Sequence, residues 1–353
     1  MSGARRYGPG MSAGPESQPP PTLSVVIPVY NEPTWIGTVV DDVVEALRRS
    51  PFVPAEVVIV DDGSGEETRE ALSRLRPPVP LRIVTQPNQG RFAARKNGVA
   101  AAQGDLVLLI DSRVSIRPDA LAFVAERLRP GGPLPIWNAH VDVDIAGNPF
   151  ARFWNVLTEI AFSQYFSNPR TTTYGLEEFD RFPKGTTCFL APRALLTEAI
   201  ASFDSAFLDT RDANDDTIMI RFMAERQRIN ISPGFSCLYR SRDSLMPFLR
   251  HARHRGGVFV DGYGRPGTRF FPVIAAFFPL SLVATVAAVR RPRLALAGIL
   301  GVPVIALGIG ARWRRSAADV VTLALLGPAW VMAFATGMWR GLWLAARGRV
   351  SRL

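Results

Sequence analysis

The sequence predicts an α/β fold with a Rossmann-like, mainly parallel sheet, followed by C-terminal transmembrane helices. Strand and helix patterns alternate four times in the first part of the chain, an order typical of doubly wound sheets. Long apolar runs are concentrated after residue 270, whereas the preceding part has the mixed composition of a soluble domain. We therefore expect a disordered tail (1–22), an α/β domain (23–245), a basic segment at a membrane interface (246–269) and a transmembrane region with two or three helices (270–353).

The first two predicted strands both end in polar residues. A buried strand is expected from Leu23 to Glu32, where it becomes polar, and residues 35–49 then carry apolar side chains at helical spacing. Residues 56–64 repeat the pattern, with paired acids and a glycine turn after the strand, before a helix over 66–75. Polar groups from both units should therefore lie at one edge of the sheet.

The next two predicted strands complete this pattern. A short strand over 81–84 leads into a helix over 92–102, and an uninterrupted apolar run over 106–110 predicts a strand covered on both faces. That strand delivers Asp111 to the edge where ligands bind in α/β domains. The alternative is that Asp111 only caps the turn into residues 117–121.

Four acidic side chains should converge at this edge, because each follows the carboxyl end of a strand. Carboxylates placed together are unfavourable unless they hydrogen-bond a polar ligand or share a metal ion. A nucleotide, with its ribose and base edge, would satisfy them, and Arg91 and Arg95 at the start of a helix could meet its phosphates. The four acids are Glu32, Asp61, Asp62 and Asp111.

The composition restricts the classes of partner and the compartment. The formal net charge of +10 comes largely from arginine. No zinc-ligand spacing or RNA-binding pattern accompanies it, which argues against nucleic acid and favours anionic lipids and phosphorylated substrates. Cys188 and Cys237 lie far apart without a CxxC pair, so we expect reduced, buried thiols and a domain that faces the cytosol. Residues 1–22 lack the apolar region of a signal peptide.

Several short motifs, in this order along the chain, resemble the family 2 glycosyltransferases, which are inverting enzymes of the GT-A fold. The resemblance extends from about Leu23 to Arg255 and implies a GT-A catalytic domain. It rests on residues 26–32 (VIPVYNE), 60–64 (VDDGS), 88–90 (NQG), 97–98 (NG), 185–193 (GTTCFLAPR) and 214–217 (NDDT).

The resemblance implies that a nucleotide-diphosphate sugar binds at the strand ends. It places Tyr30, Glu32 and Asp62 around the nucleoside. Arg91 would lie near the base or the phosphates. The residues that it implies in substrate binding are Pro28, Tyr30, Glu32, Asp61, Asp62, Arg91, Asp111, Gly185, Thr186 and Arg253.

Asp111 matches the first acid of the family's Asp-x-Asp motif, which helps to hold a divalent cation on the sugar diphosphate. The place of the second acid is taken by Arg113, which is a departure from the motif. A guanidinium cannot ligate Mg²⁺ or Mn²⁺, but it can neutralise diphosphate charge directly. The metal dependence is therefore open: either Asp111 holds Mg²⁺ or Mn²⁺, or Arg113 stands on the leaving-group side. The alternative for Arg113 is a surface residue in the turn.

Asp216 matches the catalytic base of the family. Inversion in one displacement needs a carboxylate within hydrogen-bond reach of the acceptor hydroxyl. The side chains of Asp215 and Asp216 would point about 100° apart at the start of a helix, so only one can face the sugar. We favour Asp216. The alternative for Asp216 is an N-cap or first-turn acid of a helix over 218–226. Asp215 could serve as that cap instead, or bind the acceptor.

The basic segment over 246–269 precedes the apolar region. The resemblance suggests an interfacial helix here, whose arginines, Arg253 among them, lie near the diphosphate and the lipid headgroups. The alternative is a solvated basic face attracted to anionic lipid. Apolar residues over 150–165 also recur at helical spacing, which indicates core packing or a membrane-facing amphipathic helix.

Three apolar segments are long enough to cross a bilayer, or nearly so: 271–289, 294–311 and 320–338. Arginines follow each of them, so the distribution of positive charge gives no clear orientation. If all three cross, the C-terminus lies opposite the α/β domain. If the first segment is re-entrant or interfacial, the tail returns to the cytosol.

These features predict a multi-pass protein of the cell membrane whose catalytic domain faces the cytoplasm. We expect an inverting glycosyltransferase that moves a sugar from a nucleotide-diphosphate donor to a lipid-linked or glycan hydroxyl, as in bacterial surface-polysaccharide assembly. One alternative is a polyprenyl-phosphate monoglycosyl synthase. Another is a catalytically silent membrane subunit that binds nucleotide sugars, which Arg113 alone supports.

Overall fold

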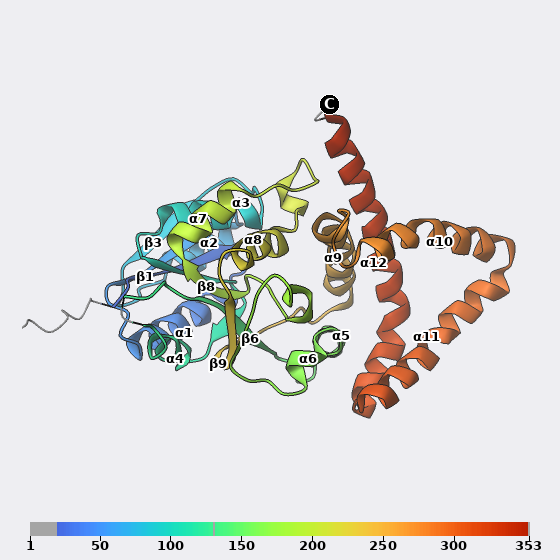
Figure 1. The fold of residues 1–353 in the computed structure, drawn as a ribbon, viewed down its shortest axis with the longest axis horizontal. Helices are drawn as coiled ribbons and strands as arrows, with labels where there is room; N and C mark the ends of the chain where they lie inside the picture. Colours follow the sequence, from blue (N-terminus) through green and yellow to red (C-terminus); the bar gives the residue numbers. More distant parts are fainter. Residues whose placement is uncertain (1–19, 130, 352–353) are drawn as a thin grey trace, which may run out of the picture.

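The computed structural model describes residues 20–129 and 131–351, in which one sheet is covered by helices on both faces and long C-terminal helices lie to one side (Figure 1). The strands are β1 (Leu23–Val29), β2 (Ala55–Asp61), β3 (Leu81–Thr85), β4 (Leu106–Ile110), β5 (Val114–Ile116), β6 (Ile136–Val143), β7 (Thr172–Tyr174), β8 (Cys188–Pro192) and β9 (Ile229–Tyr239). The α-helices are α1 (Ile36–Arg48), α2 (Glu66–Ser73), α3 (Arg91–Ala101), α4 (Ala120–Ala125), α5 (Pro149–Ala161), α6 (Ser163–Phe166), α7 (Arg193–Ala201), α8 (Asp215–Ala224), α9 (Leu245–Tyr263), α10 (Phe271–Arg290), α11 (Pro292–Trp313) and α12 (Ala317–Ser351). Two short 3₁₀-helices are η1 (Phe179–Arg181) and η2 (Thr210–Asp212).

The strands of the described chain pair in the order β3-β2-β1-β4-β8-β6-β9-β5, with β7 added to β9. The four strands expected from sequence, β1 to β4, are parallel to one another. Beyond β4 the sheet is mixed, because β8 runs antiparallel to both β4 and β6. The expected α/β fold is therefore observed, but the sheet is parallel throughout only in its N-terminal half.

Apolar layers on both faces of the sheet hold the α/β domain together. Odd-numbered residues of β1, such as Val25 and Ile27, belong to the layer that includes α1, while Val26 faces the other layer with α3. This alternation follows from the two-residue period of a strand. Helix α3 approaches closely because a Cβ at Gly98 would lie 2.3 Å from the Val26 side chain. The close approach positions the start of α3 beside the strand ends.

The folded chain begins earlier than expected. Thr22, which was assigned to the disordered tail, donates from its backbone N–H and its hydroxyl to Asp105 at 3.0 and 2.8 Å. Its carbonyl also accepts from the N–H of Leu106. These bonds arise because β1 and β4 are neighbours, which the local composition of the tail does not reveal. Residues 1–19 of the expected tail lie outside the described residues.

The expected basic interfacial segment lies mostly within α9, which is packed between the α/β domain and α12 (Figure 1). The two helices approach backbone to backbone: a Cβ at Gly256 would lie 2.2 Å from the carbonyl of Phe334, and one at Gly337 would lie 2.0 Å from that of Arg253. Phe153 of α5 and Phe248 of α9 pack with Leu323 of α12 in a separate apolar cluster. The C-terminal helices are thus joined to the domain by a tightly packed interface.

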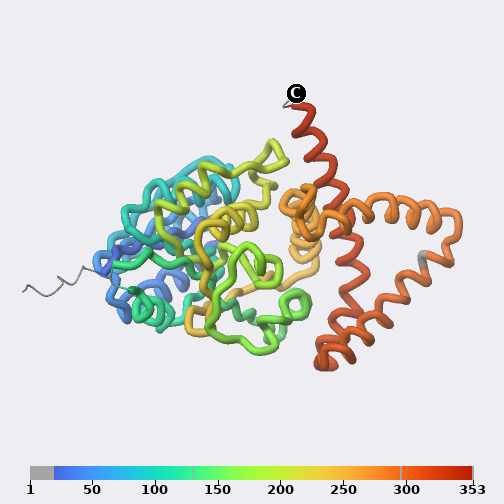
Figure 2. The backbone as a smooth tube through the Cα atoms, in the orientation of Figure 1, coloured from blue at the N-terminus to red at the C-terminus, as the bar shows by residue number. Residues whose placement is uncertain are grey.

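Within the described residues, α10, α11 and α12 are long and apolar enough to cross a membrane, judged by length and composition. Figure 2 shows α10 leading away from the domain, α11 returning, and α12 passing alongside α9. Helix α12 continues to Ser351, so the tail expected after residue 338 is part of this helix. The C-terminal half of α12 contacts the α/β domain through Arg340, which binds Asp212, and at Gly348, where a Cβ would lie 2.3 Å from the carbonyl of Ala206.

Candidate active site

A buried arginine lies at the centre of the candidate active site. The guanidinium of Arg95 donates from Nη1 to Asp215 Oδ2 at 2.5 Å and to Asp216 Oδ1 at 2.8 Å. Its Nη2 donates to Asp111 Oδ1 at 2.9 Å. Only 1% of the Arg95 surface is exposed. The planar guanidinium matches carboxylate geometry, so it holds together three like charges that would otherwise repel each other.

Three elements deliver these side chains. Arg95 lies on the first turns of α3, and Asp111 directly follows β4. The N–H of Asp111 donates to the carbonyl of Thr187 at 3.0 Å, which holds the segment before β8 beside the end of β4. Asp215 opens α8, whose N-cap is Asn214, because the Asn214 side chain accepts a backbone N–H from the first turn. The capping role considered for Asp215 therefore belongs to Asn214.

Asp216 is the accessible member of the acidic pair. Its side chain is 21% exposed, whereas that of Asp215 is 3% exposed. The Thr186 hydroxyl donates to Oδ1 of Asp216. A Cβ at Gly185 would lie 3.9 Å from Oδ2, so a glycine leaves room beside that oxygen. One oxygen of Asp216 is thus held by the protein, and the side chain remains partly accessible.

The surroundings of Asp216 and Asp111 shift the pKa values of these two carboxyl groups in opposite directions. Burial opposes ionisation of Asp216, but Arg95, Arg91 and the Thr186 hydroxyl lower its pKa to about 2. At Asp111 burial prevails over Arg95 and Arg91, so the pKa of that carboxyl is raised above its ordinary value. Carboxyl groups whose pKa values are pushed in opposite directions are typical of sites that move protons.

Asp62 organises the loop before α3. Its Oδ1 accepts from the Gln86 side chain at 2.7 Å and from the N–H of Gln89 at 2.8 Å, and its Oδ2 accepts from the N–H of Gly90 at 2.8 Å. Gly90 has a φ of +88°, a conformation that favours glycine. Asp61 similarly accepts from the N–H of Ser64. Both acids shape the loops that border the strand ends.

Glu32 and Arg113 form an ion pair across the strand ends. The Nε of Arg113 donates to Oε1 of Glu32 at 2.6 Å. The two side chains are 24% and 11% exposed, so the pair is only partly solvated. Arg113 was expected on the leaving-group side in place of the second motif acid. In the structure its nearest charged partner is an acid expected to contact the nucleoside.

A pocket of about 530 Å³ lies between the end of β1 and α9. Burial and the neighbouring arginines lower the pKa of His254 to about 4, and they also lower the pKa of His251 well below its ordinary value. The Nη2 of Arg91 lies 3.5 Å from Nε2 of His254. Three arginines and one acid line the pocket, so it carries an excess of positive charge. It is lined by Tyr30, Asn31, Glu32, Arg91, Arg242, Pro247, Arg250, His251 and His254.

The structure separates the residues predicted from sequence into groups. Tyr30, Glu32 and Arg91 meet at the pocket. Arg95 was expected to reach phosphates, but that expectation is not met, because its guanidinium is buried among carboxylates. Pro28 is a buried residue of β1. Arg253 is exposed on α9 and is not among the residues that line the pocket.

A divalent cation would find only a partial set of ligands in the protein. Among the described residues, no group of three or more His, Cys, Asp or Glu side chains is arranged to hold a metal ion. One carboxylate oxygen of Asp111 accepts from Arg95, and 26% of its side chain is exposed. Mg²⁺ sites built from one or two carboxylates and substrate phosphates fit a single open carboxylate. Asp111 is thus the residue that would hold such an ion.

Sequence reasoning missed two features of this site. It did not find that Arg95 joins three carboxylates, and it did not single out Asp261 of α9. Asp261 is buried and accepts from the N–H groups of Ala206 and Asn214 and from the Ser205 hydroxyl. These bonds join α9 to the residue that caps α8. An acid in an otherwise apolar stretch of a predicted interfacial helix was the available signal.

The chain matches known proteins over its N-terminal part. The family model described as Glycosyl transferase family 2 matches residues 24–185. EpsH of Bacillus subtilis (strain 168), named as a glycosyltransferase, is 33% identical over 113 residues, which cover 32% of this chain and 31% of EpsH. Beta-monoglucosyldiacylglycerol synthase of Synechocystis sp. is 28% identical over 202 residues, which cover 52% of this chain and 40% of that protein. The match therefore spans less than half the length of these curated relatives.

A solved structure resembles the chain over most of its length. It is the mannosyltransferase PcManGT from Pyrobaculum calidifontis in complex with GDP-Man and Mn²⁺. The TM-score is 0.53 at 18% identity, over 93% of this chain and 90% of that one. At this identity the likeness concerns the fold, which confirms the expected GT-A class. The chain thus contains a family 2 glycosyltransferase domain of the GT-A fold.

Proposed function

We propose that the protein is an inverting glycosyltransferase that moves a sugar from a nucleotide-diphosphate donor to a hydroxyl of a lipid-linked acceptor at the cytoplasmic face of the membrane. The observation that carries this proposal is the arrangement of Asp216. It is an ionised carboxylate with one oxygen held by Arg95 and Thr186, and 21% of its side chain is exposed. Such a group can take a proton from an acceptor hydroxyl in the transition state.

The low pKa of Asp216 affects the timing of this proton transfer. With a pKa of about 2 the carboxylate is ionised before the substrates bind, but it is a weak base. The acidity of the acceptor hydroxyl rises as its oxygen bonds to the anomeric carbon. Asp216 would therefore accept the proton late, when the glycosidic bond is largely formed. Arg95 and Thr186 bind the other oxygen, Oδ1, and so keep the carboxylate in place throughout.

The departing nucleoside diphosphate needs positive charge at the other end of the reaction. Arg91 supports this role because it lines the basic pocket and also lies 3.8 Å from Asp215. Arg242 and Arg250 add charge to the same pocket. If Mg²⁺ or Mn²⁺ binds, Asp111 would hold it, and the ion would supply further neutralisation of the diphosphate. PcManGT, which shares the fold, was solved with GDP-Man and Mn²⁺.

A lipid-linked acceptor is supported by the position of α9. This helix contributes Arg250, His251 and His254 to the pocket and packs directly against α12. An acceptor held at a membrane surface would thus meet the donor without leaving the bilayer. The Synechocystis relative, whose name describes a glucosyldiacylglycerol synthase, is consistent with an acceptor of this class. The basic pocket also favours a second candidate, in which the acceptor is a polyprenyl phosphate.

The proposal can be tested with the purified full-length chain in vesicles that contain either a polyprenyl phosphate or a diacylglycerol. Candidate donors are first screened by thermal shift, because a ligand that binds the native state raises the unfolding temperature. The stabilising donor is then supplied with a radiolabelled sugar. Label that moves into the lipid fraction supports the proposal, and the lipid that receives it separates the two candidates. Donor binding without transfer or hydrolysis in any condition would indicate a catalytically silent subunit.

A further inference from the structure

The exposed face of α12 carries one continuous apolar stripe. At about 100° per residue, its six members fall within a sector of roughly 40°, and Val331 and Leu342 are exposed roughly 60–80° to one side of that sector. From Val321 to Val350 the stripe is about 44 Å long at ~1.5 Å per residue, whereas a hydrocarbon core is about 30 Å thick. A helix that crossed the bilayer would not need a lipid-facing stripe of this length. Its exposed members are Val321, Leu325, Met332, Trp339, Trp343 and Val350.

The opposite face of α12 is covered by protein along the same length. Leu323 packs with α5 and α9 residues near the start of the helix. A Cβ at Gly341 would lie 2.9 Å from the carbonyl of Gly257, and one at Gly348 would lie 2.3 Å from that of Ala206. The α/β domain and α9 therefore accompany α12 from its first turns to its last.

Ion pairs connect both ends of α12 to the domain. Near its start, Asp319 accepts from Nη1 of Arg152 on α5 at 3.1 Å. Towards its end, Arg340 binds Asp212 of η2 through two hydrogen bonds of 2.8 and 2.5 Å. Asp319 and Arg340 are separated by roughly 32 Å of helix. If α12 crossed a bilayer, Arg152 and Asp212 would lie on opposite sides of it, although both belong to the folded domain.

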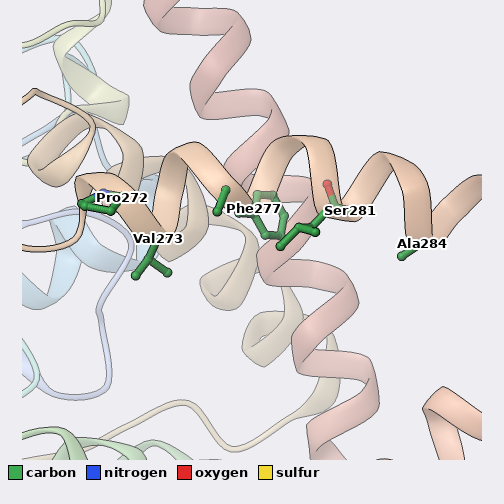
Figure 3. A pocket seen from close by; sticks show the side chains of 7 residues that line it. Pro272, Val273, Phe277, Ser281 and Ala284 are labelled. Carbon is green, nitrogen blue, oxygen red and sulfur yellow. The ribbon is translucent and has the colours of Figure 1, made fainter.

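Helices α10 and α11 differ from α12 because little of their surface is covered. Figure 3 shows Pro272, Val273, Phe277, Ser281 and Ala284 along one open face of α10. The two helices have 20 and 22 residues, so each has the length of a single span. They meet at an arginine-rich apex that lies far from the α/β domain (Figure 1). The apex contains Arg290, Arg291 and Arg293.

Both outer ends of this hairpin return to the domain side. At the start of α10, Ile274 packs with Val260 of α9 and Met338 of α12. Near the end of α11, Ala306 belongs to the cluster that contains Phe248 of α9. The chain therefore leaves and re-enters the same side, and α12 extends along that side between the two ends of the hairpin.

We propose that α12 lies in the plane of the membrane interface with its stripe against the lipid, and that only the α10–α11 hairpin enters the bilayer. The C-terminus is then on the same side as the catalytic domain, and the arginine apex reaches the opposite headgroups. Trp339 and Trp343 within the stripe fit this placement, because tryptophan favours the interface. The exposed Arg347 lies beside the stripe, where its charged end reaches the headgroups. The inference rests on the proposed membrane location, but it does not depend on glycosyl transfer.

The side of the membrane on which each segment lies can be tested with single cysteines introduced into the full chain, which is expressed in bacterial cells and labelled in their membrane. The native Cys188 and Cys237 are buried, so they contribute little labelling by an impermeant maleimide. Ser351→Cys should be labelled from the same side as the domain control Ser73→Cys, and Arg291→Cys from the opposite side. The arrangement would be overturned if Ser351→Cys and Arg291→Cys were labelled from the same side, or if Arg291→Cys and Ser73→Cys were labelled from the same side.

The orientation of α12 can be tested by depth measurement in phosphatidylglycerol–phosphatidylethanolamine vesicles. Nitroxide labels at Leu325→Cys, Met332→Cys and Trp343→Cys should report the same shallow depth, because all three positions lie on the stripe. A transmembrane helix would instead give depths that change by about 1.5 Å per residue along its axis. A steady gradient of that size would exclude the interfacial orientation. Neither experiment uses enzymatic activity, so a failure here and a failure of the proposed function are distinguishable.

Discussion

Asp216 Oδ1 lies 2.8 Å from Nη1 of Arg95, and the same oxygen accepts from the Thr186 hydroxyl. A buried cation thus occupies the side of the carboxylate that faces the protein. The relationship makes Arg95 a residue that positions the proposed base and also balances the charge of the acidic cluster. These two roles can be separated by substitution.

Arg95→Met should lower the free energy of unfolding by about 3–5 kcal/mol at neutral pH, because it leaves buried carboxylates without their partner. The loss should shrink in acid. Asp216 has a folded-state pKa of about 2, below its ordinary value, so its stabilising contribution is present above pH 3.8 and is lost as the pH falls towards 2. Denaturant unfolding at several pH values measures both effects. Arg117→Met is the matched control, because Arg117 forms an exposed pair with Asp142 and should cost less than about 1 kcal/mol.

His254 should couple nucleotide binding to pH. Its pKa is lowered to about 4 by burial and by Arg91 and Arg255. A bound diphosphate would favour the charged imidazole, so the dissociation constant of a nucleoside diphosphate should decrease several-fold between pH 7.5 and 5.5. Calorimetry measures this change, which should be much smaller in His254→Gln. His140 lies on β6 and does not line the pocket, so His140→Gln should behave as the wild type. An unaltered pH dependence in His254→Gln would refute the coupling.

The same histidine should reduce stability in mild acid. Because folding disfavours the protonated form, the unfolded chain binds more protons between pH 6.5 and 4, and stability falls as the pH decreases through this window. His254→Gln should remove this part of the pH dependence. Thermal unfolding of the two chains at pH 7.5 and 5 would show whether their difference in unfolding temperature changes in the expected direction.

Arg113 is expected to orient Glu32. Arg113→Ala should weaken donor binding by about 1.5–3 kcal/mol, the typical value of a hydrogen bond between charged groups. Binding of the nucleoside without phosphates decides between the two positions considered for this residue. If Arg113 acts through Glu32, nucleoside affinity falls as well. If it acts on the diphosphate, nucleoside affinity is unchanged, and EDTA should then affect the variant more than the wild type.

The sequence was sufficient to predict the parallel half of the sheet and the positions of its polar ends. Uninterrupted apolar runs specify buried strands locally, so Asp111 could be placed at the end of β4 before any tertiary contact was known. The start of α8 was predicted within a few residues because adjacent acids are typical of the first turn of a helix, although the cap is Asn214 and not one of those acids. Local pattern thus determined the elements, although not the antiparallel order of β8 and β6.

The charge partners could not be predicted, because they are distant in sequence. Arg95 and Asp216 are 121 residues apart, and nothing in either neighbourhood specifies the other. The interaction of Arg113 with Glu32, 81 residues away, was missed for the same reason. The proposed interfacial orientation of α12 could not be predicted for a different reason. Hydropathy reports that a segment favours an apolar environment, but a helix in lipid and a helix packed between lipid and protein give similar sequences.

The most direct test of the account is the effect of Asp216→Asn on sugar transfer by the full-length protein. Asparagine keeps the shape of the side chain but cannot take a proton, so donor affinity should stay within about twofold while kcat falls by roughly 10²–10⁴. Asp142→Asn, an exposed acid on β6, should retain wild-type kcat. Full turnover in Asp216→Asn, with unaltered donor binding, would contradict the assignment of Asp216 as the base.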